Sequence, residues 1–271
     1  MDLHLFINAF VIGLVEGITE FIPVSSTGHM IIIGHCLGFE SDKAKSLEII
    51  IQLGPILAAV LLFRNRLFSL IGMHCIHYPV YQRDNGNHLR LWHIILAMSP
   101  SVVIGLILQD EIKMLFKPYT VVFALIVGSF MLLLGDYFRI KKSCTVELDD
   151  ITYRQAFIVG CFQCLAFWPG FSRSGATISG SMLMGISPFS ALEFSFILAV
   201  PMMIGTTALE LYNSISLFSL VDLQIFTVGF VTSFIVAMMI IKLFLGKMKR
   251  IYFTPFAIYR FIVAAFVYFL L

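Results

Sequence analysis

The sequence predicts an all-α integral membrane protein, built as an inverted-topology repeat with six membrane spans and two re-entrant helical hairpins. The composition is the first reason: 59% of the 271 residues are hydrophobic and only 13% are charged, whereas soluble domains carry roughly 25% charged residues. The second reason is that long apolar stretches recur along the chain, two of them interrupted by proline, glycine and hydroxyl residues. A chain this apolar belongs in a bilayer, and its net charge of +2 gives no support for a nucleic-acid partner.

Six uninterrupted apolar stretches are the predicted spans, because a helix needs about 20 residues to cross a bilayer. They cover residues 47–63, 91–109, 120–138, 190–211, 222–243 and 252–271, and the first of them is short for a span. The N-terminus has no basic segment followed by a small-residue cleavage site, so we expect no removable signal peptide.

Two further apolar regions, residues 5–37 and 155–186, carry polar or charged side chains in their middle. Proline, glycine and hydroxyl residues interrupt both regions, and neither piece of either region is long enough to span alone. Broken helices at membrane depth are tolerated only where protein or water covers the freed backbone groups. We therefore predict that both regions are re-entrant helical hairpins.

The two interrupted regions also resemble each other. EGITEFIPVSSTGH, residues 16–29, aligns without a gap with QCLAFWPGFSRSGA, residues 163–176, which places Ser25 over Ser172 and Gly13 over Gly160. Each copy precedes an apolar span that contains a proline. Similar segments that enter from opposite faces indicate an inverted repeat, whose site lies near the midplane where the broken helices meet. The halves are predicted to be approximately residues 1–119 and 120–271.

The loop charges predict the orientation. With both hairpins re-entrant, loops 64–90, 139–154 and 244–251 share one side and carry Arg64, Arg66, Arg83, Arg90, Arg139, Lys141, Lys142, Arg154, Lys247, Lys249 and Arg250. The other side receives loops 38–46, 110–119 and 212–221, in which Lys43, Lys45, Lys113 and Lys117 are mixed with Glu40, Asp42, Asp110 and Glu111. The positive-inside rule assigns the first set to the cytoplasm.

In the first hairpin, Glu16 and Glu20 are four residues apart, so both carboxylates would lie on one face of a helix. Carboxylates at membrane depth need a partner or a function. A divalent cation with oxygen ligands would satisfy both. The competing interpretation is a structural pair neutralised by an arginine or by protonation.

The next residues of this hairpin could bind phosphate. Pro23 stops the first helix, and Ser25 or Ser26 can cap the next one. A helix that begins there points free N–H groups into the site, which suits a phosphate. Ser26 or Ser25 could act as a nucleophile with His29 as its base or an acid, or the serines could be caps alone.

The second hairpin supplies an arginine among hydroxyl groups. Arg173 offers a planar fork that fits phosphate oxygens, and Ser172, Ser174 and Thr177 add donors. The alternative is that Arg173 neutralises Glu16 or Glu20, a pairing that could also hold in the empty protein.

EGITEFIPVSSTGH and PGFSRSGAT, residues 169–177, resemble the two signature segments of the undecaprenyl-diphosphate phosphatase family of the bacitracin-resistance type. Residues 51–54 and 198–203 are also similar to family sequence, and the resemblance covers nearly the whole chain. It implies a metal-dependent phosphatase with an active site open to the periplasm of the bacterial inner membrane. The family's functional residues match Glu16, Glu20, Ser25, Ser26, Thr27, His29, Ser172, Arg173, Ser174 and Thr177.

The activity that this resemblance implies is hydrolysis of undecaprenyl diphosphate to undecaprenyl phosphate and inorganic phosphate. That reaction recycles the lipid carrier for peptidoglycan synthesis and confers bacitracin resistance. The expected partners are the polyprenyl diphosphate lipid and the membrane, and a homodimer is one candidate assembly.

We assign phosphate binding to Arg173 and the hairpin backbone with Ser25, Thr27, Ser172, Ser174 and Thr177. Glu16 and Glu20 would hold Mg²⁺ or Ca²⁺, Ser26 would be the nucleophile, and His29 would assist proton transfer. Phosphoryl transfer depends mainly on positioning and charge neutralisation. Attack by a metal-activated water is the alternative, with Glu20 or His29 as base and Ser26 only binding phosphate.

Two other functions compete. Phosphohistidine lipid phosphatases also carry a string like S-G-H, but this chain has no Arg-Pro pair and position 179 is Ser179 rather than histidine. A transporter or lipid flippase would also use inverted repeats with broken helices. Phosphate release by purified protein in detergent, without a gradient, separates a phosphatase from a transporter.

Topology gives the first testable prediction. Cysteines introduced into loops 64–90 and 139–154 should resist an impermeant reagent in intact cells, because basic loops resist export. Cysteines in loop 110–119 should label readily and serve as the control. Ready labelling of both basic loops would overturn the orientation.

Overall fold

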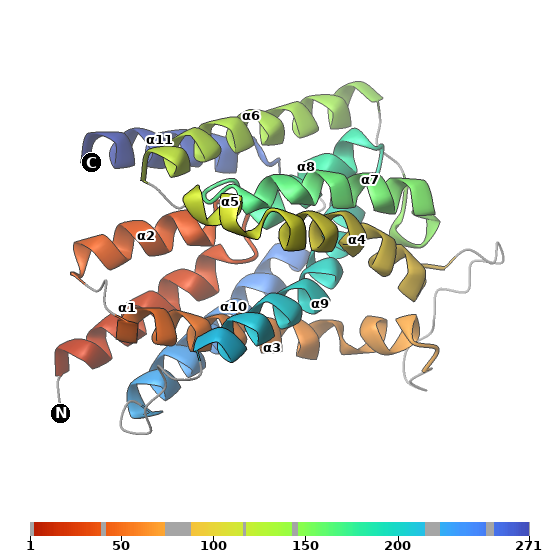
Figure 1. Ribbon diagram of the computed structural model, residues 1–271. Helices are drawn as coiled ribbons and strands as arrows, with labels where there is room; N and C mark the ends of the chain where they lie inside the picture. The colour runs from red at the N-terminus through yellow and green to blue at the C-terminus, as the bar shows by residue number, and fades with distance from the viewer. Residues whose placement is uncertain are drawn as a thin grey trace.

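The computed structural model describes residues 3–38, 42–73, 88–115, 118–142, 146–214, 223–247 and 252–270. These residues form helices and no strand, apart from an isolated bridge between Val146 and Ile186. The α-helices are α1 (Leu3–Thr19), α2 (Ser26–Cys36), α3 (Asp42–Leu70), α4 (Leu91–Ile107), α5 (Gln109–Met114), α6 (Pro118–Lys142), α7 (Tyr153–Gln163), α8 (Arg173–Leu183), α9 (Pro188–Ser214), α10 (Leu223–Lys247) and α11 (Thr254–Leu270). Short 3₁₀ turns, η1 (Leu148–Asp150) and η2 (Cys164–Phe167), flank α7 (Figure 1).

Four helices in the described part of the chain are long and apolar enough to cross a bilayer. They are α3, α6, α9 and α10. The helices α1, α4 and α11 are also apolar, but each has 17 residues. The prediction of an all-α membrane protein is therefore confirmed, whereas the count of six spans and the re-entrant position of the hairpins stay predictions.

The first predicted span differs most from the structure. The stretch 47–63 was expected to be short, but α3 continues through Pro55 to Leu70, so Arg64 and Arg66 belong to a helix and not to a loop. Proline has no N–H for the carbonyl four residues earlier, and the Ser233 hydroxyl of α10 donates to that Ile51 oxygen at 2.7 Å. A hydroxyl from a neighbouring helix thus lets α3 continue past the proline.

The two helices that the predicted repeat aligns each pack closely against one other helix. In the register of the sequence alignment α1 corresponds to α7, and extensive helix contacts join α1 to α10 and α7 to α4. Gly13 lies against the Gly229 backbone in the first contact, and Gly160 lies against the Ala97 backbone in the second. A side chain at either aligned glycine would collide with the facing helix. The division into halves at residues 119 and 120 stays a prediction.

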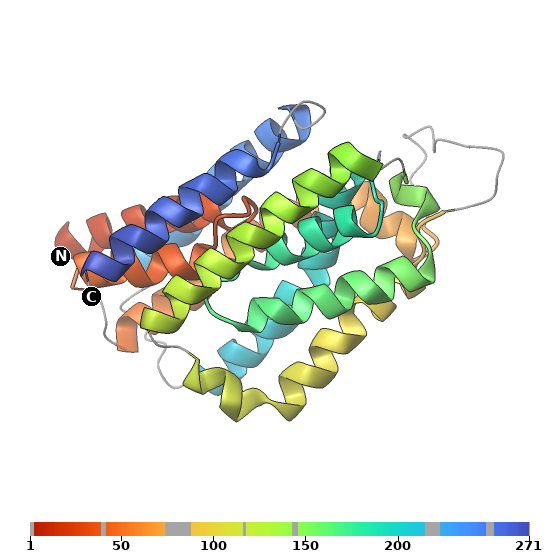
Figure 2. The same cartoon turned by 90° about the horizontal axis from the view of Figure 1, so that it is seen from above.

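The buried middle of α9 lies at the centre of the bundle and contacts α3 and α8. Phe196 of α9 packs edge-on against Phe21 at the α1–α2 break, with ring centroids 4.9 Å apart. Helices α6 and α11 lie side by side in both views, and α1 begins at the end of the molecule where α11 finishes (Figures 1 and 2). This packing brings the two helix breaks together against α9.

The orientation depends partly on residues outside the described ranges. Those residues include Glu40, Arg83, Lys117, Lys249 and Arg250. The cytoplasmic assignment of the basic loops therefore stays a prediction.

Candidate active site

Two serines in strained backbone conformations form the turns at the helix breaks. Ser25 has a φ of 75° and Ser172 a φ of 77°, and they are the only non-glycine residues with positive φ in the described part of the chain. Such values cost about 1–3 kcal/mol each and concentrate at functional sites. The sequence alignment had placed these two serines over each other.

Each strained serine caps the helix that follows it. The Ser25 hydroxyl accepts a hydrogen bond from the Gly28 N–H of α2 at 3.2 Å. The Ser172 hydroxyl accepts one from the Gly175 N–H of α8 at 3.1 Å. Of the two serines considered as the cap of α2, Ser25 is therefore the cap and Ser26 is the first residue of the helix.

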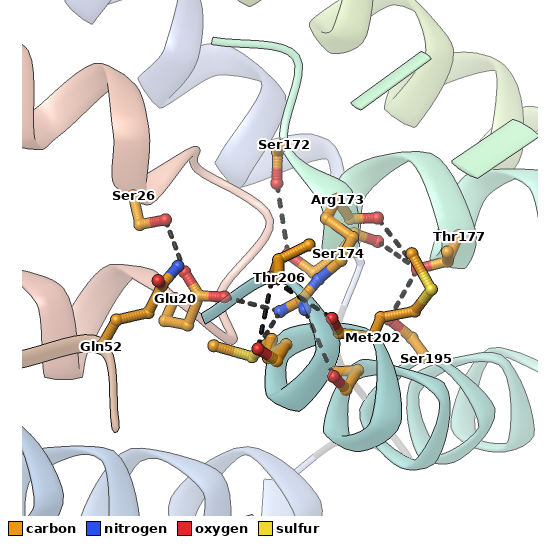
Figure 3. A network of polar contacts seen from close by, with 12 residues as sticks. Glu20, Ser26, Gln52, Ser172, Arg173, Ser174, Thr177, Ser195, Met202 and Thr206 are labelled. Atoms are coloured by element: carbon orange, nitrogen blue, oxygen red, sulfur yellow. Dashed lines mark hydrogen bonds and ion pairs between the residues drawn. The ribbon is translucent and has the colours of Figure 1, made fainter. Parts of the chain in front are cut away.

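Ser26 and Arg173 occupy equivalent positions, each directly after a strained serine. The Ser26 hydroxyl donates to Glu20 Oε2 at 2.5 Å, and Arg173 Nη2 donates to Glu20 Oε1 at 2.5 Å. Figure 3 shows Glu20 between the two side chains. A carboxylate of the first hairpin thus joins the hydroxyl of its own hairpin to the guanidinium of the second.

Arg173 is held on its other side by α9. Its Nη2 contacts Met203 Sδ at 3.1 Å, and its Nη1 donates to the Ala199 carbonyl at 3.5 Å. The Arg173 side chain keeps 20% of its surface exposed and that of Glu20 keeps 8%. The pair is therefore largely shielded, yet it borders an open space.

That space is a cavity of about 250 Å³ between the two hairpins, α3, α4 and α9. Its polar lining includes Glu20, Ser25, Ser26, Thr27, Ser172 and Arg173, all of them predicted site residues. Met202, Met203, Ala166 and Phe167 provide an apolar part of the wall. A guanidinium, two helix N-termini and several hydroxyl groups at one cavity suit an oxyanion.

Other predicted site residues lie outside the cavity lining. Glu16 is buried beside Glu20, with Glu48 also near. The Ser174 hydroxyl donates to the Ile22 carbonyl at 3.2 Å and so links the two hairpins. The Thr177 hydroxyl bonds to the Arg173 carbonyl at 3.0 Å and to the Ser195 hydroxyl at 2.6 Å.

His29 also lies away from the Ser26 hydroxyl. Its Nδ1 is 2.7 Å from the Ser25 carbonyl oxygen, and its Nε2 is 2.7 Å from the Tyr259 hydroxyl. Because a carbonyl can only accept, Nδ1 carries the proton and a neutral ring accepts from Tyr259 at Nε2. In this geometry Glu20, not His29, contacts the predicted nucleophile.

Sequence reasoning missed several polar residues of the cavity wall: Gln52, Ser101, Gln163, Thr206 and Glu210. All but Gln163 come from the predicted spans, where isolated polar residues were a usable signal. The sequence signal for Gln163 was stronger, because this residue aligns with Glu16 in the repeat. Its amide donates to the Ser101 hydroxyl at 3.0 Å and so joins the second hairpin to α4.

Comparison with known families agrees with this geometry. The family described as bacitracin resistance protein BacA matches residues 9–266, nearly the whole chain. The matched range includes both strained serine turns, the Glu20–Arg173 pair and every residue of the cavity lining. The chain therefore belongs to the BacA bacitracin-resistance family, the undecaprenyl pyrophosphate phosphatases.

Proposed function

We propose that this protein hydrolyses undecaprenyl diphosphate to undecaprenyl phosphate and inorganic phosphate. The observation that carries the proposal is the triad of Ser26, Glu20 and Arg173 at one cavity, which combines a hydroxyl, its proton acceptor and a cation for phosphate. Recycling of the lipid carrier for peptidoglycan synthesis, and with it bacitracin resistance, would follow from this reaction.

Substrate binding uses charge and backbone donors together. The Arg173 fork would bind phosphate oxygens, assisted by the first-turn N–H groups of α2 and α8 and the hydroxyls of Ser25, Thr27 and Ser172. Ser174 and Thr177 would support this site through the backbone that they bond. The cavity of about 250 Å³ suits a diphosphate head group, so the prenyl chain would remain in the bilayer.

The reaction begins with Ser26 in this mechanism. Its hydroxyl oxygen attacks the terminal phosphorus, its proton moves to Glu20, and the phosphoanhydride bond breaks to release the lipid monophosphate. Water then hydrolyses the phosphoserine to free phosphate. His29 supports the Ser25 backbone and is a second candidate for proton transfer. The alternative is direct attack by water, with Ser26 as a phosphate ligand.

The donor set near Glu20 fits a divalent cation. Glu16 and Glu20 are neighbouring carboxylates, and Glu20 also forms the ion pair with Arg173. Their oxygens suit Mg²⁺ or Ca²⁺, which prefer oxygen ligands. No group of three His, Cys, Asp or Glu side chains is arranged for a metal within the described residues, so phosphate or water would complete the coordination. When bound, the ion would neutralise charge on the phosphate oxygens.

The proposed setting is the bacterial inner membrane, with six spans, two re-entrant hairpins and the cavity open to the periplasm. Four long apolar helices and the position of the cavity at the two helix breaks support this arrangement. A transporter would share this architecture. The hydrogen bond from the Ser26 hydroxyl to the Glu20 carboxylate favours a hydrolase over a transporter.

Arg173→Lys tests the cation. Lysine keeps the charge but loses the planar fork, so we expect turnover to fall by about 100-fold or more with the fold intact. Phosphate release and thermal unfolding in detergent measure the two effects. Activity near that of the wild type would make Arg173 structural.

The nucleophile is tested by Ser26→Ala, with Ser25→Ala and Thr27→Ala as matched neighbours. Loss of a nucleophile should cost several orders of magnitude, whereas loss of one neutral hydrogen bond to phosphate should cost roughly 5- to 150-fold. Acid quenching with substrate labelled at the terminal phosphate should trap a labelled protein only when Ser26 is present. A drop of only about tenfold for Ser26→Ala would assign the attack to water.

Metal dependence is the third test of the reaction. A chelator should abolish phosphate release, and Mg²⁺ or Ca²⁺ should restore it. Glu16→Gln should raise the metal concentration needed for half-activation, because it removes one charge from the pair and leaves Glu20 as the proton acceptor. Glu210→Gln, which changes a carboxylate elsewhere in the cavity wall, should leave that concentration unchanged. Full activity in excess chelator would show that the reaction needs no divalent cation.

A further inference from the structure

Arg260 of α11 is a cation that the proposed reaction does not use. Its side chain is fully buried, with 0% of its surface exposed, inside an apolar helix. Its Nη2 donates to the carbonyls of Phe171 at 2.8 Å, Gly170 at 3.1 Å and Ala124 at 3.3 Å. A charged side chain at such a depth is costly, so its contacts indicate what it does.

The Arg260 guanidinium donates hydrogen bonds to backbone carbonyls and not to a carboxylate. None of its contacts in the described ranges is to a carboxylate, and its Nε and Nη1 find no hydrogen-bond partner there. Gly128 of α6 lies against the guanidinium, where a side chain would collide, and a Cβ at Gly175 of α8 would lie only 3.0 Å from Nη1. Two of the three carbonyls that it binds belong to the residues directly before Ser172, so Arg260 restrains the turn that directs Arg173.

The preceding residue, Tyr259, reaches the other hairpin. Its hydroxyl donates to His29 Nε2 at 2.7 Å, and His29 Nδ1–H donates to the Ser25 carbonyl at 2.7 Å. The two rings stack with centroids 5.6 Å apart and planes 7° apart. Tyr259 thus acts on the first strained turn through His29, as Arg260 acts directly on the second.

We propose that Tyr259 and Arg260 are positioning residues that hold the two strained serine turns, and with them Ser26 and Arg173, in their reactive geometry. Adjacent residues of one helix therefore restrain both halves of the site. A turn with positive φ at a serine relaxes unless its surroundings fix it. Arg260 bonds two carbonyls of the second turn directly, whereas the Ser25 carbonyl of the first turn is bonded by His29, which Tyr259 contacts. The proposal rests on the proposed phosphatase function.

The competing explanation is that α11 only stabilises the fold. A separate contact provides the matched control: Asp136 of α6 accepts hydrogen bonds from the Thr254 N–H at 2.6 Å and hydroxyl at 2.8 Å, where α11 begins. Asp136→Asn should therefore lower the unfolding temperature and leave the turnover number within about twofold of the wild type.

The experiment compares full-length variants in detergent on a polyprenyl diphosphate. Arg260→Met should lower kcat by about 100-fold and Tyr259→Phe by about tenfold, with KM changed less than about threefold, because alignment in the transition state is lost. Arg260→Lys should recover most of the activity, since an ammonium can still donate to the carbonyls. Equal losses of unfolding temperature in Arg260→Met and Asp136→Asn, with kcat preserved in both, would overturn the proposal.

A double-mutant cycle tests the route through His29. In a His29→Ala background Tyr259→Phe should cost less than about twofold, because the shared contact is already gone. An undiminished tenfold cost would overturn the role of Tyr259. The ¹⁵N spectrum of the His29 ring gives a readout without turnover: Tyr259→Phe should shift Nε2, and an unchanged spectrum would refute the contact. If the wild type released no phosphate, the proposed function would fail and this spectrum would still decide the Tyr259 contact.

Discussion

The largely shielded ion pair between Arg173 and Glu20 is the constraint on which the site depends. It joins the second hairpin to the first at 2.5 Å, and the same carboxylate binds Ser26. Either charge alone would be expensive at membrane depth, and breaking such a pair costs about 3–5 kcal/mol. The pair therefore keeps the cation and the hydroxyl together, and in the proposed reaction an incoming phosphate would compete with Glu20 for a guanidinium that is already in place.

Backbone strain at Ser25 and Ser172 complements this pair. Each serine has a positive φ, and its hydroxyl caps the next helix. The residue that follows it, Ser26 or Arg173, is thereby directed toward the cavity. Equivalent turns thus present different chemistry in the two halves: a hydroxyl in one and a guanidinium in the other. The two halves of the predicted repeat can specialise in this way because the two turns meet at one cavity while their sequences diverge.

Hydroxyl side chains within the apolar helices bond the backbone carbonyls that prolines leave free. Ser233 satisfies the carbonyl freed by Pro55 in α3, and Ser99 does the same at 2.9 Å for the Leu96 carbonyl freed by Pro100 in α4. In a bilayer no water replaces a lost backbone hydrogen bond. Prolines in these helices therefore do not mark their ends. Helix α3 is longer than its apolar pattern predicts because it continues through Arg64 and Arg66 to Leu70.

The sequence alone determined the class of protein and the register of its repeat. Apolar length and the gapless match of residues 16–29 with 163–176 report burial in lipid and local backbone geometry, both of which are short-range properties. Tertiary structure alone decided which partners the polar groups take. The Ser26 hydroxyl donates to Glu20 and not to His29, and the Arg260 guanidinium donates to backbone carbonyls and not to a carboxylate. These choices depend on contacts between residues far apart in the chain, such as Glu20 with Arg173 and Arg260 with Phe171, and such contacts leave no periodic trace in the sequence.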